Sequence, residues 1–306
     1  MAIASTARTR AAYIAETVPG VTPATPTFKE FRRTSGNLRT KKTTVQSDQI
    51  TLDRNVRDEY MVGQDVEGSY DFEFSADTHD DILAGVLCGT WATDVLVNGV
   101  TAQSFTFEET IDLSGSYAYH RFPGCRIDTM ALNFASRKAI AGSINIKGQQ
   151  QTLATAIISG ATYTAATTTP VETAVNVASL TVAGASAKVR ALSLNIANNL
   201  RGRETVGNLY VDSFGMGMCD VTGTIEAYFE SNTLYQSVLD HGGGAVSLTA
   251  GGTANKKYTF LLPAVKFLDG AVKLGGKNDD VMVSIPFRAI YDATTAGSIK
   301  ITRAVA

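Results

Sequence analysis

The residues best placed to do chemistry are acidic side chains that alternate along one predicted strand. Within 66–75, Glu67, Asp71 and Glu73 fall on one face, because successive side chains of a strand point to opposite sides of the sheet. Alternate residues of a strand lie about 7 Å apart, a spacing compatible with the paired carboxylates of a glycosidase. A carboxylate-based hydrolase is therefore one hypothesis for this chain.

A second strand repeats the acidic pattern less fully. The polar face of 221–230 keeps Glu226 and Glu230, and no aromatic sugar platform accompanies them. We therefore rank a solvated face or an electrostatic lining above catalysis.

Other residue types that build catalytic or metal sites are sparse. His79, His120 and His241 are the histidines, and none stands at metal-ligand spacing from Cys, Asp or Glu. The chain has no P-loop and no GxSxG elbow. Gly215-Met216-Gly217 lacks the third glycine and the strand–turn–helix context of a dinucleotide site. The sequence predicts no catalytic, cofactor or metal site, and a structural role for His79.

The charge of the 306-residue chain is nearly balanced but unevenly distributed. The net charge of −2 argues against general affinity for nucleic acid through phosphate neutralisation. Residues 8–42 carry a net +6, whereas residues 43–112 carry a net −13. Two readings stay open: a solvated surface, which we slightly favour, or basic and acidic faces that meet between copies of the chain.

Cysteine usage and hydropathy predict a protein made in the cytoplasm. Cys88, Cys125 and Cys219 are odd in number and form no CxxC pair, which is typical of free thiols in a reducing compartment. Neither a signal-peptide core nor a membrane-spanning stretch stands out. We expect no membrane partner.

The chain repeats itself at a constant offset of 155 residues. The segment 65–68 (DVEG) returns at 220–223 (DVTG), and 141–146 (AGSINI) returns at 296–301 (AGSIKI). A repeat in one register predicts two tandem copies of one β-rich unit. We expect an extended N-terminal arm over 1–26, a first domain over 27–150, an Ala/Thr-rich connector over 151–170 and a second domain over 171–306.

Each copy is predicted to hold several strands and one short helix. N-cap candidates at 75–78 and at 231–233 precede apolar helical patterns that end near Gly89 and near 242–244. The polar stretch 53–59 predicts a long loop or hairpin tip, and a hairpin is expected around Gly184. Pro286 predicts an edge or a bulge. Strands are expected at 28–33, 41–52, 66–75, 104–109, 128–134, 142–147, 175–182, 188–196, 221–230, 258–262, 281–287 and 298–302.

Several segments in order resemble a known family. They are 13–20 (YIAETVPG), Phe28-x-x-x-Arg32-Arg33-Thr34, Ser47-x-x-Ile50-x-x-Asp53-Arg54, 82–91 (ILAGVLCGTW) and 192–200 (LSLNIANNL) before a Val-x-Gly strand. The combination resembles the major tail tube protein of long, non-contractile-tailed (siphovirus-type) bacteriophages in its duplicated-domain form. The resemblance implies two tandem β-sandwich or barrel-like units, each with one short flanking helix.

The resemblance also implies a structural function rather than an enzymatic one. Subunits would form rings that stack into a hollow tube, through which genome DNA passes without specific binding. Partners would be other copies of the chain, a tape-measure protein, and tail terminator and tail-tip proteins. The protein would reside in the virion after synthesis in the bacterial host cytoplasm. Another virion ring protein, such as a tail terminator or capsid-decorating protein, is the main alternative.

Site residues follow from that role. A conduit for DNA is expected to repel phosphate rather than bind it, so the lumen-facing candidates are Glu67, Asp71, Glu73, Glu226 and Glu230. The ring-stacking candidates are Arg8, Arg10, Arg54, Arg57, Asp58 and Glu59. Two units per chain favour a trimer that presents six units per ring, and a hexamer with the second units outside stays open.

Overall fold

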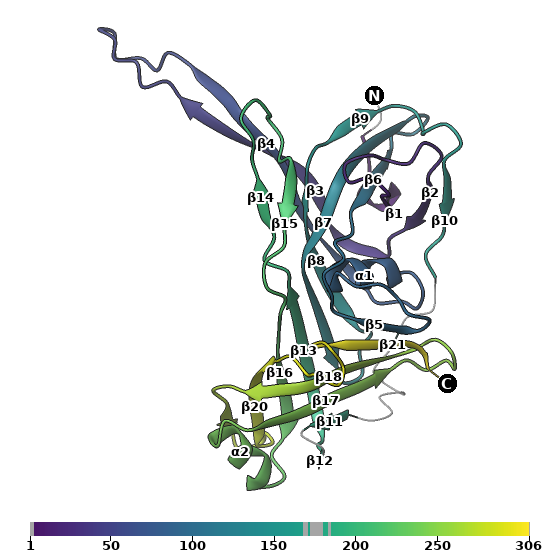
Figure 1. Ribbon diagram of the computed structural model, residues 1–306, viewed down its shortest axis with the longest axis vertical. Coiled ribbons are helices and arrows are strands. Elements are labelled where there is room, and N and C mark those ends of the chain that lie inside the picture. The colour runs from purple at the N-terminus through teal and green to yellow at the C-terminus, as the bar shows by residue number, and fades with distance from the viewer. Residues whose placement is uncertain (1–2, 168–170, 172–179, 183–184, 306) are drawn as a thin grey trace.

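The computed structural model describes residues 3–167, 171, 180–182 and 185–305, and this part of the chain is mainly β (Figure 1). Among these residues, nineteen strands belong to one hydrogen-bonded system, and β14 and β15 form a separate pair. The predicted mainly β class is confirmed.

The first half holds a long projecting hairpin and one helix. Strands β3 and β4 extend together beyond the body of the molecule (Figure 1). The elements are the 3-10 helix η1 (Thr6–Arg8), β1 (Thr9–Ala15), β2 (Thr27–Glu30), β3 (Arg33–Gln46), β4 (Glu59–Glu73), α1 (Asp80–Leu87), β5 (Val95–Val97), β6 (Phe105–Asp112), β7 (Tyr117–Ala135), β8 (Ala141–Gly148), β9 (Thr152–Ala154) and β10 (Thr162–Thr164).

The second half adds shorter strands and a second helix at the far end of the molecule (Figure 1). Its elements are β11 (Leu180–Val182), β12 (Ala185–Ser186), β13 (Val189–Ala197), β14 (Arg201–Arg203), β15 (Ser213–Gly215), β16 (Asp220–Tyr228), α2 (Asn232–Leu239), β17 (Gly243–Ala250), β18 (Lys257–Phe267), β19 (Ala271–Lys273), β20 (Met282–Ala289) and β21 (Lys300–Val305).

A central antiparallel sheet runs through both halves in the order β3-β4-β8-β7-β13-β16-β20. We call this array the central sheet. The pairing of β7 with β13 joins the first half to the second. One row of cross-strand neighbours is apolar and buried throughout: Tyr70, Ile144, Met130, Ile196 and Val221. Period-two alternation therefore gives the central sheet one apolar face and one polar face.

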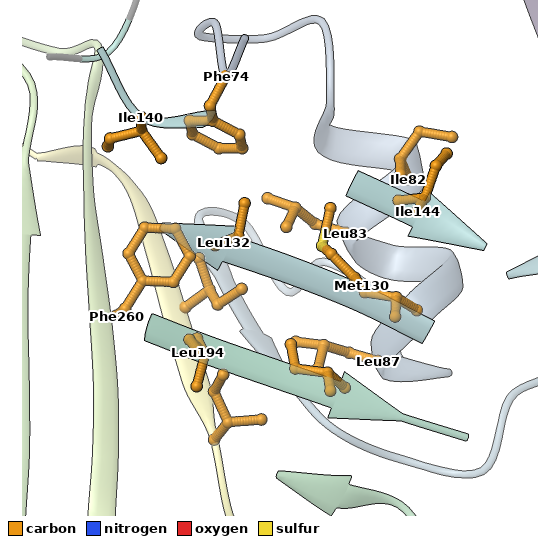
Figure 2. Packing of buried hydrophobic residues seen from close by; sticks show 14 of the residues in the cluster. Phe74, Ile82, Leu83, Leu87, Met130, Leu132, Ile140, Ile144, Leu194 and Phe260 are labelled. Carbon is orange, nitrogen blue, oxygen red and sulfur yellow. The ribbon is translucent and has the colours of Figure 1, made fainter. Parts of the chain in front are cut away.

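Helix α1 covers part of the apolar face. Figure 2 shows Leu83 and Leu87 of α1 directed toward Met130 of β7 and Leu194 of β13. The side chains of Leu83 and Leu87 are at most 1% exposed. Fully burying a leucine contributes roughly 1.5–3 kcal/mol, so this contact is a main source of stability for the first half.

The ends of α1 match the predicted position but not the predicted caps. The N-cap residue is His79, and its side chain makes no capping hydrogen bond. None of the N-cap candidates predicted within 75–78 therefore occupies the N-cap position. At the other end Cys88 takes a left-handed conformation with φ 47°, one residue before the predicted stop at Gly89. Helix α2 also lies where the sequence predicts it.

A second, smaller sheet packs over the first half of the central sheet. It contains β10, β2, β1, β6, the first part of β7 and β9. Rings from the two layers meet, since the centroids of Tyr70 on β4 and Phe107 on β6 are 5.8 Å apart. Within the smaller sheet, the Phe107 centroid also lies 5.9 Å from that of Tyr13 on β1. The first half is thus a β-sandwich whose layers share the 19-residue strand β7.

The N-terminal arm is the clearest correction to the sequence prediction. Residues 9–15 form β1, which pairs with β6 along its whole length. Ala12 and Tyr13 are 0% exposed. For these residues the structure differs from the extended arm predicted over 1–26, because their apolar side chains complete the chain's own core.

The structure agrees with one of the two predicted hairpins and differs from the other. Residues 53–59 do lie at the tip of the β3–β4 hairpin, whose last pair is Gln46 with Glu59. In the second prediction β11 pairs antiparallel with β12, and the strand expected at 188–196 is not its partner. That strand, β13, lies between β7 and β16, because its apolar face completes the core of the central sheet. Residues 175–179 and Gly184 of this prediction lie outside the described residues.

The order of elements repeats, but the pairing of strands repeats only in part. Strand, helix and strand follow one another in both halves, and the pairs β3–β4 and β13–β16 correspond at the offset of 155 residues. The second neighbour differs: β4 pairs with β8, whereas β16 pairs with β20, and β21, which overlaps the counterpart of β8, pairs with β18 and β5. Tandem duplication and the predicted domain boundaries therefore stay predictions. Pro286 lies where β18 stops pairing with β20 and β19 begins, so the expected irregularity is present in a strand that is not at an edge.

Candidate functional site

The polar face of the central sheet is the most extensive candidate site. One row of direct cross-strand neighbours reads Asp71, Ser143, Ala131, Asn195, Thr222 and Arg288. Each of these side chains is at least partly exposed. The opposite face is buried, so burial of one face determines which side chains the other face presents.

All five predicted lumen residues belong to this face or its border. Glu67, Asp71 and Glu73 lie on β4. Glu226 lies on β16, and Glu230 follows that strand. The register that aligns Glu226 with Ala191, and Ala191 with Ala135 of β7, places the acids of both halves on the same side.

Glu67 is held by two basic side chains of the neighbouring strand. A terminal nitrogen of Arg39 lies 2.8 Å from Glu67 Oε1, and Lys41 Nζ lies 3.2 Å from Oε2. The hydrogen bond that Arg39 donates is the main cause of the lowered pKa of Glu67. A general acid for glycoside hydrolysis needs a raised pKa, so this carboxylate is tuned in the opposite direction.

The other predicted acids also have partners. Asp71 accepts a hydrogen bond from the Ser35 hydroxyl. The three glutamates form ion pairs: Glu73 with Arg32 at 2.9 Å, Glu226 with Lys273 at 3.3 Å, and Glu230 with Lys188 at 2.6 Å. The Lys188 hydrogen bond lowers the pKa of Glu230. The expected acidic face is therefore an ion-paired face.

Sequence reasoning missed these basic partners. Arg39 and Lys41 are opposite Glu67 and Asp65 only because β3 and β4 pair in one particular register. The same face holds two further pairs, Lys147 with Asp128 at 2.9 Å and Arg288 with Asp220 at 3.1 Å. A signal was present in the alternation of Arg39 and Lys41, but the hairpin register was needed to interpret it.

His79, for which the sequence predicts a structural role, lies in the core. Its ring stacks on Phe72 and Phe74 at centroid distances of 4.7 and 5.3 Å. Burial lowers its pKa to about 4, so the ring is neutral near pH 7. Its Nε2 atom is buried without a hydrogen-bond partner. Within the described ranges, no group of three His, Cys, Asp or Glu side chains could hold a metal ion.

The ring-stacking candidates fall into two separate regions. Arg54, Arg57, Asp58 and Glu59 lie at the exposed tip of the β3–β4 hairpin. This tip also exposes apolar side chains, with Ile50 97% and Leu52 107% exposed. The hairpin is braced at its base, where the Gln64 amide donates to the Leu209 carbonyl in the loop between β14 and β15 at 2.7 Å.

Arg8 and Arg10 are engaged within their own subunit rather than grouped with the tip. Arg8 pairs with Asp112 at 2.5 Å. The Arg10 guanidinium lies 3.6 Å from Glu30 and 3.5 Å from the centroid of the Tyr163 ring. These contacts attach η1 to β6, and β1 to β2 and β10, so the two arginines have a structural use in the single chain.

Comparison with known proteins gives the family. No curated protein matches the chain. None of the helices in the described part is long and apolar enough to cross a membrane. All three cysteines are free, as the sequence predicts. The model of the phage tail tube protein family matches residues 6–289, and the chain, as its segments indicated, belongs to the phage tail tube protein family.

Proposed function

We propose that copies of this chain form rings that stack into a tube, with the polar face of the central sheet lining a lumen for genome DNA. Family membership makes the chain a structural subunit of a phage tail tube. The proposal that the polar face lines the lumen rests on the continuity of this face across seven strands from both halves.

An open strand edge supports closure by a neighbouring copy. Among the described residues, β3 pairs with β4 and with no second strand, although the Leu38 amide of β3 donates to the Glu109 carboxylate at 3.0 Å. A 14-residue edge strand exposes a row of backbone donors and acceptors that invites pairing with another chain. A neighbour in the ring would satisfy these groups and extend the central sheet into a closed wall. Glu67, Asp71, Glu73, Glu226 and Glu230 would then face the lumen.

The projecting hairpin is the proposed contact between rings. Its tip carries Arg54, Arg57, Asp58 and Glu59 next to exposed apolar side chains. Exposed apolar groups on an extended arm gain stability when a partner covers them. Arg8 and Arg10 remain proposed stacking residues at the other region, although they also serve the fold of the single chain.

A tube of this kind implies an oligomeric state and further protein partners. A trimer presenting six units per ring is favoured, and a hexamer is the alternative. A tape-measure protein would occupy the lumen during assembly, and terminator and tip proteins would contact the two ends. Synthesis would take place in the host cytoplasm.

Electron microscopy of the purified protein over a range of concentration and salt tests the proposal. Stacked rings or tubes with three-fold or pseudo-six-fold end views are expected. Closed rings that never stack would overturn it in favour of a terminator or decorating protein. A variant without residues 50–56, which lie beyond the last β3–β4 pair, should fold normally but form few stacked rings. Normal tubes from this variant would show that the hairpin tip is not part of the stacking contact.

A further inference from the structure

We infer that the polar face of the central sheet is a charge-compensated surface, which lets double-stranded DNA slide without net attraction or net repulsion. This inference rests on the proposed function, because it concerns the surface that DNA would meet. It replaces the expectation of a purely acidic lumen.

Opposite charges alternate directly across the strands of the first half. The register aligns Arg39 on β3 with Glu67 on β4, and Glu67 with Lys147 on β8. Lys147 in turn lies 2.9 Å from a carboxylate oxygen of Asp128. Charges of alternating sign therefore lie side by side on β3, β4 and β8, and the alternation ends at β7, where Lys147 is aligned with a second base, Arg126.

The second half uses different residues to the same effect. Arg288 on β20 pairs with Asp220 on β16, and Lys273 on β19 pairs with Glu226 on β16. By register and contact, the acids of the face and its border are Asp65, Glu67, Asp71, Glu73, Asp128, Asp220, Glu226 and Glu230. The bases outnumber them by one: Arg32, Arg39, Lys41, Arg126, Lys147, Lys188, Lys266, Lys273 and Arg288.

The space between the ion pairs is filled by small, mostly polar side chains. They are Ser35, Asn37, Ser69, Ser143, Asn145, Thr129, Ala131, Asn133, Ser193, Asn195, Thr222, Thr224 and Ser284. Such groups bind water and offer no flat ring on which a base could stack. The exposed aromatic residue Tyr228 lies at the end of β16, opposite Met282. The surface between the charges is thus hydrated and weakly adhesive.

Charge compensation has a direct consequence for DNA. Non-specific binding to DNA is driven by cations that replace condensed counterions, so a surface with almost no surplus of cations gains little from it. A surface without surplus anions equally imposes little barrier. The field of a close pair falls off within the Debye length of about 8 Å at physiological ionic strength, so a moving phosphate meets an almost even potential.

A pair of matched double variants tests this compensation. Glu67→Gln with Glu226→Gln removes two acids and leaves Arg39, Lys41 and Lys273 without their carboxylates. Asp48→Asn with Glu204→Gln makes the same change in net charge at exposed positions that have no ion-pair partner among the described residues. Binding of a 20-base-pair duplex is measured by fluorescence anisotropy at low salt, at protein concentrations where subunits are dispersed.

We expect the first variant to bind the duplex about tenfold more tightly than wild type, with affinity that falls steeply with salt, as phosphate contacts require. The control variant should stay close to wild type. Equal affinity of the two variants, or no gain in either, would overturn the inference. Electron microscopy of the same preparations reports separately on tube formation, so failure of the proposed function is distinguishable from failure of charge compensation.

Discussion

The two helices occupy corresponding places in the chain but very different environments. Both follow a strand of the central sheet, α1 after β4 and α2 after β16. Seven of the eight residues of α1 are buried, whereas Val238 is the buried residue of α2. The difference shows that a similar local pattern does not determine burial: α1 is enclosed by strands of both halves, and α2 lies at the far end of the second half (Figure 1).

The contacts at the start of α1 explain part of this difference. Asp80 accepts a hydrogen bond from Tyr258 of β18 at 2.7 Å, and it pairs with Arg303 of β21 at 2.6 Å. The Arg303 guanidinium also lies 4.4 Å from the Trp91 ring centroid. Helix α1 therefore joins the two halves. Within the part of the chain that the structure describes, the side-chain hydrogen bonds of α2 are made to the helix itself or to its C-cap, as between Gln236 and Asp240.

Truncation of one leucine in each helix should give the largest contrast. Leu83→Ala is expected to lower the free energy of unfolding by about 2–5 kcal/mol, because it opens a cavity in the core. Leu239, which is 62% exposed, is the leucine chosen in α2 for comparison, and Leu239→Ala should change stability by less than about 0.5 kcal/mol. Urea denaturation followed by circular dichroism measures both; similar losses would show that α2 is also buried in solution.

The N-caps of the two helices should respond differently to acid. The α1 N-cap His79 has its pKa lowered to about 4 by burial, below the usual value of about 6.5. The unfolded chain thus binds the proton more readily, and stability falls as the pH falls from about 6.5 toward about 4, by about 3 kcal/mol in total. The α2 N-cap is Ser231, which does not titrate.

Denaturation at pH 7 and pH 4 separates this effect from that of the carboxylates. The His79→Gln variant has no titrating group at the site, so it should lose about 3 kcal/mol less than wild type over the same pH interval. A matched His241→Gln variant, changed just after the exposed end of α2, should keep the acid sensitivity of wild type. If His79→Gln is as sensitive to acid as wild type, the buried ring is not the cause.

Removal of one hydroxyl at the joint between the halves should give a smaller effect. The Tyr258 hydroxyl donates to Asp80 and accepts from the Asp77 amide at 2.9 Å. Tyr258→Phe leaves both partly buried groups without this partner, and we expect a loss of about 1–3 kcal/mol. Tyr228, which is 40% exposed, is the control, and Tyr228→Phe should be neutral. Thermal unfolding measures both variants; a neutral Tyr258→Phe would contradict a role for this bond in joining the halves.

Much of the local structure was predictable from side-chain alternation. The apolar positions of 66–75 are buried as expected, with Val66 2% and Phe72 1% exposed. Both helices and the hairpin tip at 53–59 also lie where the pattern indicates. These features depend on neighbours within a few residues, for which period and turn chemistry are sufficient.

The candidate site was predicted only in part. Its acids were visible as one face of a strand, but their basic partners come from other strands. Arg39 and Lys147 lie 28 residues before and 80 residues after Glu67 in the sequence, and their alignment depends on two strand registers. The same limit concealed β1, because a Pro-containing segment at the N-terminus carries no local sign that Tyr13 completes a core.

Sequence alone was sufficient for the β class, the two faces of β4 and β16, the two short helices and the ordered segments that resemble the tail tube family. The tertiary structure decided that β13 lies between β7 and β16, that α1 is enclosed while α2 is exposed, and that the acids of the polar face are compensated. The physical reason is that alternation is a local property of a strand. Neighbours in a sheet are chosen by non-local packing, which rewards whichever pairing buries the most apolar surface with its backbone groups hydrogen-bonded.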